Sequence, residues 1–216
     1  MSLVDGLGCW ARVHHPLELR NTSALFLDRD GVIIDDVGYL SRPEGVRLID
    51  GAASAIARVN ALAIPVVSIT NQSGIGRGFY TWGDFEAVQD ALDHDLMQHS
   101  AHLDMVLACG YHDVGHGELG VADHAWRKPN PGMLLAARDR LRLNLEKCFI
   151  VGDRLSDLEA GCRAGVRRGA LVRSGYVSDA ETGLASLPPG FSAIAVDSLA
   201  EAIDESCAFL SEHDVR

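Results

Sequence analysis

The sequence predicts an α/β fold in which helices cover a parallel sheet. Short apolar segments alternate along the chain with longer segments in which apolar residues recur at helical spacing. Polar or acidic residues directly follow several of the apolar segments, as they do at the carboxyl ends of parallel strands. This alternation favours a parallel sheet whose strands are joined by right-handed helical crossovers.

The segment 24–32 is the one around which the rest is arranged. Four apolar residues at 24–27 run directly into Asp28, Arg29 and Asp30, and a glycine follows. An apolar run of this kind predicts a strand buried on both faces, with the two carboxylates at its carboxyl end. Taken alone, the segment also fits an ordinary acidic turn.

The remaining elements follow in order. Residues 1–23 have weak periodicity and are expected to form a lead-in segment with a short strand near 10–13, and residues 24–216 to form one domain. Asp50, Thr81 and Asn130 are the expected N-caps of the helices that follow them. Glycine and proline predict loops at 32–45 and 174–191. Further strands are expected at 64–70, 104–109, 147–153, 169–172 and 193–196, and helices at 51–62, 82–100, 131–142, from 157 onward and at 199–210.

Composition narrows the classes of function. The chain has 216 residues, and no window approaches the 18 consecutive apolar residues of a membrane span. The N-terminus does not have the pattern of a secretory signal. Five scattered cysteines, an odd number, argue against a disulfide framework and favour a reducing, cytoplasmic setting. A net charge of −11 disfavours nucleic acid and anionic membranes as partners. We expect a monomer that acts on a small phosphorylated molecule.

Polar groups converge from four separate segments. Each follows an expected strand, so a parallel sheet would bring all four to one edge. This convergence is more specific than any single motif. The groups are Asp28 with Asp30, Thr70, Arg127 with Lys128, and Asp153 with Asp157.

These residue types suit phosphoryl transfer. Asp28 would attack phosphorus and become an aspartyl phosphate, and Asp30 would protonate the leaving oxygen and then deprotonate water. Asp28, the Asp30 carbonyl and Asp153 would hold Mg²⁺, which prefers oxygen ligands. Thr70 and Lys128 would bind the other phosphoryl oxygens.

The same segments resemble a known family. Residues 28–32, 70–74, 127–129 and 152–157 are similar, in order and spacing, to the four motifs of the haloacid-dehalogenase (HAD) phosphatase superfamily. Residues 70–78 and 127–133 favour the subgroup of D-glycero-D-manno-heptose-1,7-bisphosphate 7-phosphatases and histidinol-phosphate phosphatase domains. The resemblance covers about 24–172 and implies a three-layer, Rossmann-like domain without a large cap.

The resemblance also implies a substrate pocket shaped by short loops. In the heptose enzyme, the arginine beside the motif lysine binds the second phosphate of the sugar, and Arg127 fits that role. Arg154 stands after the metal-binding acid, where relatives often have lysine, and should keep the positive charge with a different reach. The substrate-binding residues implied are Arg29, Asp36, Tyr39, Asn71, Gln72, Ser73, Arg127 and Arg154.

One departure from the family concerns zinc. Many relatives carry a structural zinc loop of four ligands just before the Arg-Lys-Pro motif, and Tyr111 and Trp126 occupy two of those four positions here. A zinc site of one thiolate and three imidazoles is one alternative, and ordinary loop histidines are the other. The residues in question are Cys109, His112, His116 and His124.

The leading hypothesis is therefore a Mg²⁺-dependent phosphatase of heptose bisphosphate. The nearest alternative is a phosphatase of histidinol phosphate or of another sugar phosphate. A non-catalytic phosphate-binding protein is an alternative of another class, but binding alone does not require both Asp28 and Asp30. A DNA end phosphatase is disfavoured by the acidic charge and the lack of a basic stripe.

Overall fold

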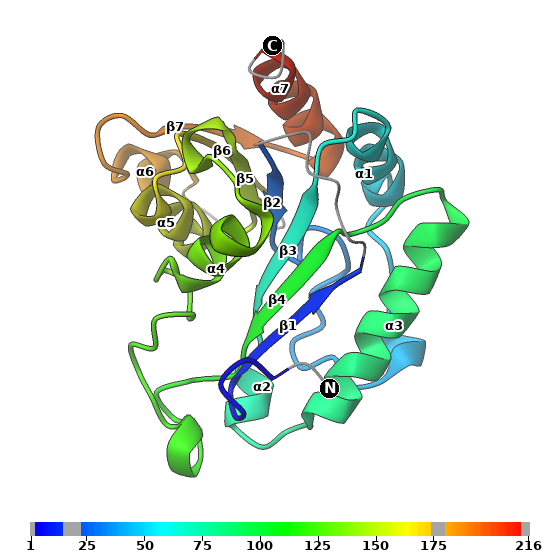
Figure 1. Cartoon of the computed structure of the whole chain (residues 1–216), viewed down its shortest axis with the longest axis vertical. Helices are drawn as coiled ribbons and strands as arrows, with labels where there is room; N and C mark the ends of the chain where they lie inside the picture. The colour runs from blue at the N-terminus through cyan, green and yellow to red at the C-terminus, as the bar shows by residue number, and fades with distance from the viewer. Residues whose placement is uncertain (1–2, 15–22, 174–179, 213–216) are drawn as a thin grey trace.

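The computed structural model describes residues 3–14, 23–173 and 180–212, and these form a seven-stranded sheet (Figure 1). The strand order is β1-β4-β3-β2-β5-β6-β7, and every neighbouring pair is parallel except β1 with β4. The predicted parallel α/β fold is confirmed, with one antiparallel strand added at its edge. The strands are β1 (Cys9–Val13), β2 (Leu25–Leu27), β3 (Val66–Asn71), β4 (Met105–Cys109), β5 (Phe149–Gly152), β6 (Arg168–Val172) and β7 (Ser192–Val196).

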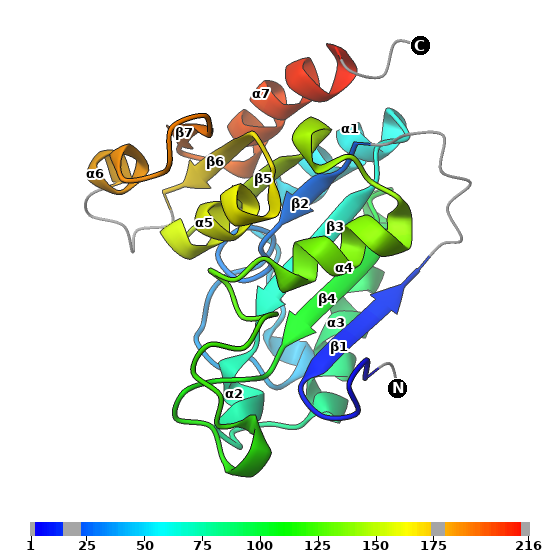
Figure 2. The same ribbon diagram turned by 60° about the vertical axis from the view of Figure 1, so that its left-hand side comes forward.

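Helices cover both faces of this sheet, which gives three layers (Figures 1 and 2). One face carries α1 (Ala52–Ala61), α3 (Trp82–Gln98) and α7 (Leu199–Glu212). The other carries α4 (Gly132–Leu141), α5 (Leu155–Ala164) and α6 (Ala180–Ala185). A short helix, α2 (Ser73–Gly76), follows β3 at its carboxyl end. Short 3-10 helices lie at Pro43–Gly45, Gly117–Leu119 and Leu145–Lys147.

The central strand β2 shows why the sheet is buried on both sides. Leu25 and Leu27 pack into the core beneath α1 and α3, whereas Phe26 points to the opposite face and packs into the core beneath α4 and α5. All three residues are fully buried. Since side chains alternate across a strand, only an uninterrupted apolar run can satisfy both faces. β2 is therefore a rigid base for the residues that follow it.

Several predicted helix starts differ from the structure. Thr81 caps α3 in a capping box with Asp84, as predicted. The N-cap of α1 is Gly51 rather than Asp50, and its φ of 80° suits a residue without a Cβ. Pro131 rather than Asn130 precedes α4, and the side-chain oxygen of Asn130, which could have capped the helix, accepts instead from Arg163. α5 begins at Leu155, two residues before the predicted start.

The ends of the chain also differ in part from the prediction. The strand expected near 10–13 is present as β1. The loop expected at 174–191 contains α6, and the expectations for 1–2, 15–22 and 174–179 lie outside the described residues. Among the described helices, none combines the length and apolar character that crossing a bilayer requires.

Candidate active site

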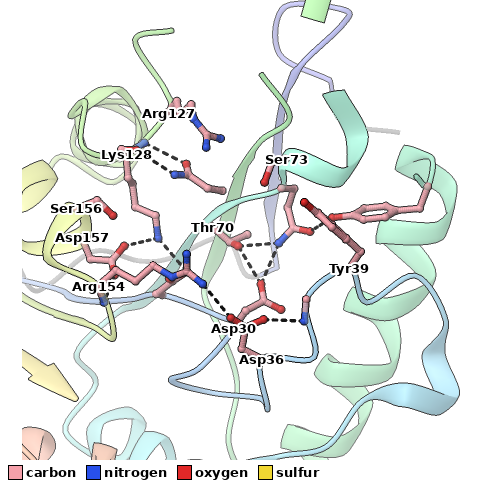
Figure 3. A pocket seen from close by; sticks show the side chains of 15 residues that line it. Asp30, Asp36, Tyr39, Thr70, Ser73, Arg127, Lys128, Arg154, Ser156 and Asp157 are labelled. Atoms are coloured by element: carbon pink, nitrogen blue, oxygen red, sulfur yellow. Dashed lines mark hydrogen bonds and ion pairs between the residues drawn. The ribbon is translucent and has the colours of Figure 1, made fainter. Parts of the chain in front are cut away.

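A pocket of about 290 Å³ opens at the carboxyl ends of β2, β3 and β5 (Figure 3). Short loops after each strand supply its walls, so residues far apart in the sequence face one another there. The edge is the one at which ligands bind in open α/β sheets. Its lining residues are Asp28, Asp30, Asp36, Gly38, Tyr39, Thr70, Asn71, Gln72, Ser73, Tyr80, Arg127, Lys128, Arg154, Ser156 and Asp157.

Lys128 lies at the centre of a buried charge cluster in this pocket. Its Nζ is 2.9 Å from Asp28 Oδ1 and 2.7 Å from Asp157 Oδ1, and it donates to the Ile69 carbonyl at 2.9 Å. Burial by itself would lower the pKa of Lys128, but the charges of Asp157 and Asp28 raise it. The lysine is therefore held as a cation beside Asp28.

Burial has the opposite consequence for Asp28. It raises the pKa of this carboxyl to about 8, and the carboxylates of Asp157 and Asp153 add to the effect while Lys128 opposes it. The single positive charge of Lys128 is therefore not enough to return the pKa of Asp28 to its usual range. A divalent cation would supply the missing charge.

The acids are close enough together to share such a cation. Asp28, Asp153 and Asp157 are all buried, and each has a carboxylate oxygen within 4.8 Å of an oxygen from the other two. Both oxygens of Asp157 already have partners, Lys128 Nζ and the Arg154 backbone N–H. Asp28 and Asp153 directly follow two adjacent parallel strands, so their carboxylates face the same edge of the sheet, and a set of carboxylate oxygens suits Mg²⁺.

Two glycines allow the acids to converge. Gly31 has a φ of +83°, and a Cβ there would lie 2.3 Å from Asp153 Oδ2. A Cβ on Gly152 would lie 2.2 Å from Asp157 Cβ. Any larger residue at either position would separate the segment after β2 from the segment after β5.

Asp30 is only partly buried and has four donors around its carboxylate. Oδ2 accepts from Arg29 Nε at 3.1 Å, Thr70 Oγ1 at 3.2 Å and Gln72 Nε2 at 3.0 Å, and Oδ1 accepts from Arg29 Nη2 at 3.2 Å. The structure thus brings Asp30 to the same pocket as Asp28 in a fixed orientation. Thr70, which we expected to meet a phosphoryl group, donates to Asp30 here.

Arg29 does not lie where a substrate ligand would. Its side chain is 1 % exposed and is not part of the pocket lining. The guanidinium forms a two-bond pair with Asp30 and stacks 5.0 Å from the centre of the Phe85 ring. Arg29 therefore supports Asp30 from outside the pocket lining, whereas we expected it among the residues that face the substrate.

Arg127 and Asn71 frame another wall. The Asn71 amide donates to the Lys128 carbonyl and accepts from the Lys128 backbone N–H, both at 3.0 Å, which fixes the segment that carries the lysine. Arg127 lines the pocket and donates to the Tyr111 carbonyl at 3.0 Å. Asn71 therefore acts here through Lys128, whereas the Arg127 guanidinium, half-buried at the rim, faces the pocket (Figure 3).

The open side of the pocket is bordered by Asp36, Arg154 and Tyr39. Arg154 Nη2 is 3.0 Å from Asp36 Oδ2, so the loop after β2 is joined to the start of α5. Tyr39 accepts a hydrogen bond from Arg77 and packs edge-on against Phe79. Ser73, at the start of α2, lines the same side.

The predicted zinc ligands are not brought together. Cys109, His112, His116 and His124 do not form a group with converging ligand atoms in the described part of the chain. The ring of His124 instead stacks on the ring of Tyr111, with the two ring centres 3.8 Å apart, and lies near Asp5 and Cys9. Both carboxylate oxygens of Asp5 accept hydrogen bonds. The Tyr111 hydroxyl donates to Oδ2, and the backbone N–H groups of residues 7–9 donate to Oδ1.

Two pocket residues escaped sequence reasoning. Tyr80 lies beside Gln72, but nothing in its local pattern distinguishes it from a core aromatic. Ser156 lies between Arg154 and Asp157 at the start of α5, where a serine would also fit an ordinary helix start. The spacing of Asp153 and Asp157 was the available signal that this turn belongs to the site.

The parallel sheet and its acid-rich pocket fit the class of phosphoric monoester hydrolases with an α/β fold. Residues 125–202 match the family model described as HAD-hydrolase-like. A D-glycero-beta-D-manno-heptose-1,7-bisphosphate 7-phosphatase from Mesorhizobium japonicum is 48% identical, over 78% of this chain and 73% of the relative. The protein of that name from Escherichia coli K12 is 38% identical, over 72% of this chain and 82% of the relative. This chain belongs to the HAD phosphatase family, in the group that contains these heptose bisphosphatases.

Solved structures agree with this assignment. A HAD-like phosphatase from Mesorhizobium loti, 40% identical, superposes with a TM-score of 0.86 over 98% of this chain and 97% of its own. The D,D-heptose 1,7-bisphosphate phosphatase from B. bronchiseptica, solved with magnesium and phosphate, is 31% identical. It superposes with a TM-score of 0.72 over 86% of this chain and 98% of its own.

Proposed function

We propose that this phosphoric monoester hydrolase removes the 7-phosphate of D-glycero-D-manno-heptose 1,7-bisphosphate. The observation that carries the proposal is the placement of Asp28 beside Lys128 and Asp30 in a pocket with Arg127 on its rim. The names of relatives 37–48% identical to this chain support the choice of substrate.

In this proposal Asp28 is the nucleophile and Asp30 the proton carrier. An Asp28 carboxylate oxygen bonds to phosphorus while the bond from phosphorus to the sugar oxygen breaks, and that oxygen takes the proton of Asp30. Water then attacks the aspartyl phosphate and gives a proton back to Asp30, which restores both carboxyl groups. Lys128, fixed 2.9 Å from Asp28, stabilises the charge on the phosphoryl oxygens. Thr70 can join it by turning from Asp30 to a phosphoryl oxygen.

Magnesium is the proposed cofactor. The side chains of Asp28 and Asp153, with the Asp30 carbonyl, would hold it, and when bound it neutralises the acids and the phosphoryl group. Asp157 holds Lys128 in place. The proposal includes no zinc, since the described residues do not gather the four expected ligands.

Arg127 is the proposed ligand of the second phosphate. A guanidinium at the rim can bind a phosphate with two hydrogen bonds while the first phosphate lies beside Lys128. Asp36, Tyr39, Ser73 and Arg154 would surround the sugar between the two phosphates.

The setting of the enzyme is also part of the proposal. We place the whole of 24–216 in one domain of a monomeric, cytoplasmic enzyme. All five cysteines are free thiols, which is consistent with a reducing compartment.

The test is a Mg²⁺-dependent phosphate-release screen. It compares heptose 1,7-bisphosphate, other sugar mono- and bisphosphates and histidinol phosphate, and we expect the heptose bisphosphate to have the highest kcat/KM. Asp28→Asn should abolish turnover of every substrate. A higher kcat/KM for histidinol phosphate or another sugar phosphate would overturn the substrate, and full activity of Asp28→Asn would overturn the nucleophile.

A second measurement isolates the role of Arg127. Arg127→Ala should lower kcat/KM about 10-fold or more for the bisphosphate, because hydrogen bonds to charged groups contribute about 1.5–3 kcal/mol. The corresponding monophosphate should be affected much less. Equal losses for the two substrates would remove the proposed contact.

A further inference from the structure

A tyrosine hydroxyl in the wall of the pocket is linked to Asp30 through one intervening side chain, that of Gln72. Tyr80 is 8 % exposed, and its hydroxyl donates to Gln72 Oε1 at 2.5 Å. Burial raises the pKa of the Tyr80 phenol, so the hydroxyl keeps the proton that it donates. Gln72 itself is 3 % exposed, so its amide has no solvent to replace a lost partner.

The bond from Tyr80 determines which way the Gln72 amide faces. With Oε1 held by the tyrosine, Nε2 points to the opposite side and donates to Asp30 Oδ2 at 3.0 Å and to Thr70 Oγ1 at 2.7 Å. Thr70 in turn donates to the same Asp30 oxygen at 3.2 Å (Figure 3). A reversed amide would place its oxygen against a carboxylate, which is unfavourable.

The two oxygens of Asp30 are consequently different. Oδ2 accepts three hydrogen bonds, from Arg29, Thr70 and Gln72, and the bonds from Arg29 and Gln72 still occupy it when Thr70 turns to a phosphoryl oxygen. Oδ1 accepts one, from Arg29 Nη2 at 3.2 Å. Oδ1 is therefore the oxygen that remains available for a reacting group.

We propose that Tyr80 is a positioning residue for proton transfer, acting through Gln72 to fix Oδ1 of Asp30 as the oxygen that gives and receives the proton. The inference rests on the proposed phosphatase mechanism and goes beyond it. In the first step the Oδ1–H bond breaks and a new O–H bond forms on the leaving oxygen as the phosphorus–oxygen bond breaks. In the second step the attacking water transfers one proton to Oδ1.

The backbone around Tyr80 is shaped for this contact. A Cβ on Gly74 would lie 2.1 Å from Tyr80 Cε1, so only glycine lets the ring approach the turn that carries Gln72. Tyr80 lies between the end of α2 at Gly76 and the start of α3 at Trp82. The hydroxyl thus has a fixed position relative to Asp30.

The test uses leaving groups of different quality, independent of the natural substrate. Phenoxide is a poor leaving group that needs protonation, whereas p-nitrophenoxide leaves readily without it. In single-turnover experiments with Mg²⁺, Tyr80→Phe should slow phosphoryl transfer from phenyl phosphate about 10-fold, a part of the ~10²–10⁴-fold that a positioned proton donor supplies. The rate with p-nitrophenyl phosphate should change less than about 2-fold, and KM should be unchanged for both.

Tyr111→Phe is the matched control. It also loses one hydroxyl of a buried tyrosine, one that is bonded to Asp5, so it reports the effect of a missing hydroxyl away from Asp30. Its ratio of the two rates should equal that of the wild type. Equal slowing of both substrates by Tyr80→Phe, or no slowing of either, would overturn the role of Tyr80.

The same experiment separates this inference from the proposed function. Failure of the wild type to hydrolyse heptose 1,7-bisphosphate would contradict the substrate alone, since the aryl phosphates still test Tyr80. A changed rate ratio in Tyr80→Phe would then support its role whatever the natural substrate.

Discussion

At the scale of single residues, the site depends on charges that are buried together. Lys128 contacts two carboxylates, and no solvent can replace it, because its side chain and that of Asp157 are almost completely buried. Leaving a buried charge without its partner typically costs several kcal/mol. The same lysine is positioned to stabilise a phosphoryl group next to Asp28, so stability and activity depend on one side chain.

Lys128→Met should therefore lower kcat about 10²–10³-fold, the usual effect of removing a preorganised donor. Circular dichroism and thermal unfolding at the assay temperature show whether the variant is folded. Lys147→Met is a matched control, because Lys147 is the other lysine of the chain and lies outside the pocket. Comparable losses in the two variants would contradict the role of Lys128.

Gly31 is a second position at which a change of a single residue should disturb the site, because there is no room for a Cβ. Gly31→Ala places a Cβ 2.3 Å from Asp153 Oδ2 and also forces a side chain into a positive φ, which costs about 1–2 kcal/mol. We expect weaker Mg²⁺ binding by isothermal titration, with lower activity that added Mg²⁺ partly restores. Gly165→Ala has the same kind of backbone strain at a φ of +99° but meets no atom within 4 Å. Equal Mg²⁺ affinities of the two variants would show that the clash is harmless.

At the scale of elements, strand ends and helix starts deliver the functional groups. β2 ends immediately before Asp28, β3 contains Thr70 and Asn71, and β5 ends immediately before Asp153. Since these strands are adjacent and parallel, their carboxyl ends meet. The start of α3 matters in a different way, because Phe85 on that helix packs against Arg29, which holds Asp30.

The capping box of α3 gives a prediction about this element. Thr81→Ala removes the side-chain oxygen that accepts from the Asp84 backbone N–H and should lower the free energy of unfolding by about 1 kcal/mol. Urea unfolding measures this change in the free energy of unfolding. Thr81→Ser keeps the oxygen and should stay within a few tenths of a kcal/mol of the wild type. An equal loss for both variants would indicate that the methyl group, and not the cap, stabilises the helix.

At the scale of the whole molecule, cation binding should couple to folding. The converging acids Asp28 and Asp153 directly follow β2 and β5, and the unfolded chain cannot bring them together. A cation at 100 times its dissociation constant then stabilises the folded state by about 2.7 kcal/mol, which corresponds to a rise of about 5–10 °C in Tm for a chain of this size.

Differential scanning calorimetry with and without Mg²⁺ checks this coupling. Asp153→Asn should lose most of the rise in Tm. Asp204→Asn, which changes an exposed acid paired with Arg58 on the surface, should keep it. A rise of the same size in both variants would place the stabilising cation elsewhere.

The sequence by itself determined the parallel fold and the acids that face one another. An apolar run directly followed by acids leaves few alternatives, because buried strands must be apolar on both faces and their ends gather at one edge. The expected order of strands and helices is confirmed for most elements. Local sequence patterns predicted the wrong residue where two neighbours could each serve as the N-cap of a helix, as Asp50 and Gly51 could at the start of α1.

Tertiary structure alone decided how the polar side chains are oriented. Arg29 turned beneath the pocket to hold Asp30, and Tyr80 came to control the amide of Gln72. Cys109, His112, His116 and His124, close in sequence, did not converge. The physical reason is that hydrophobic periodicity fixes which face a residue occupies, whereas a hydrogen bond depends on distances of a few tenths of an ångström between segments that meet only in the folded protein.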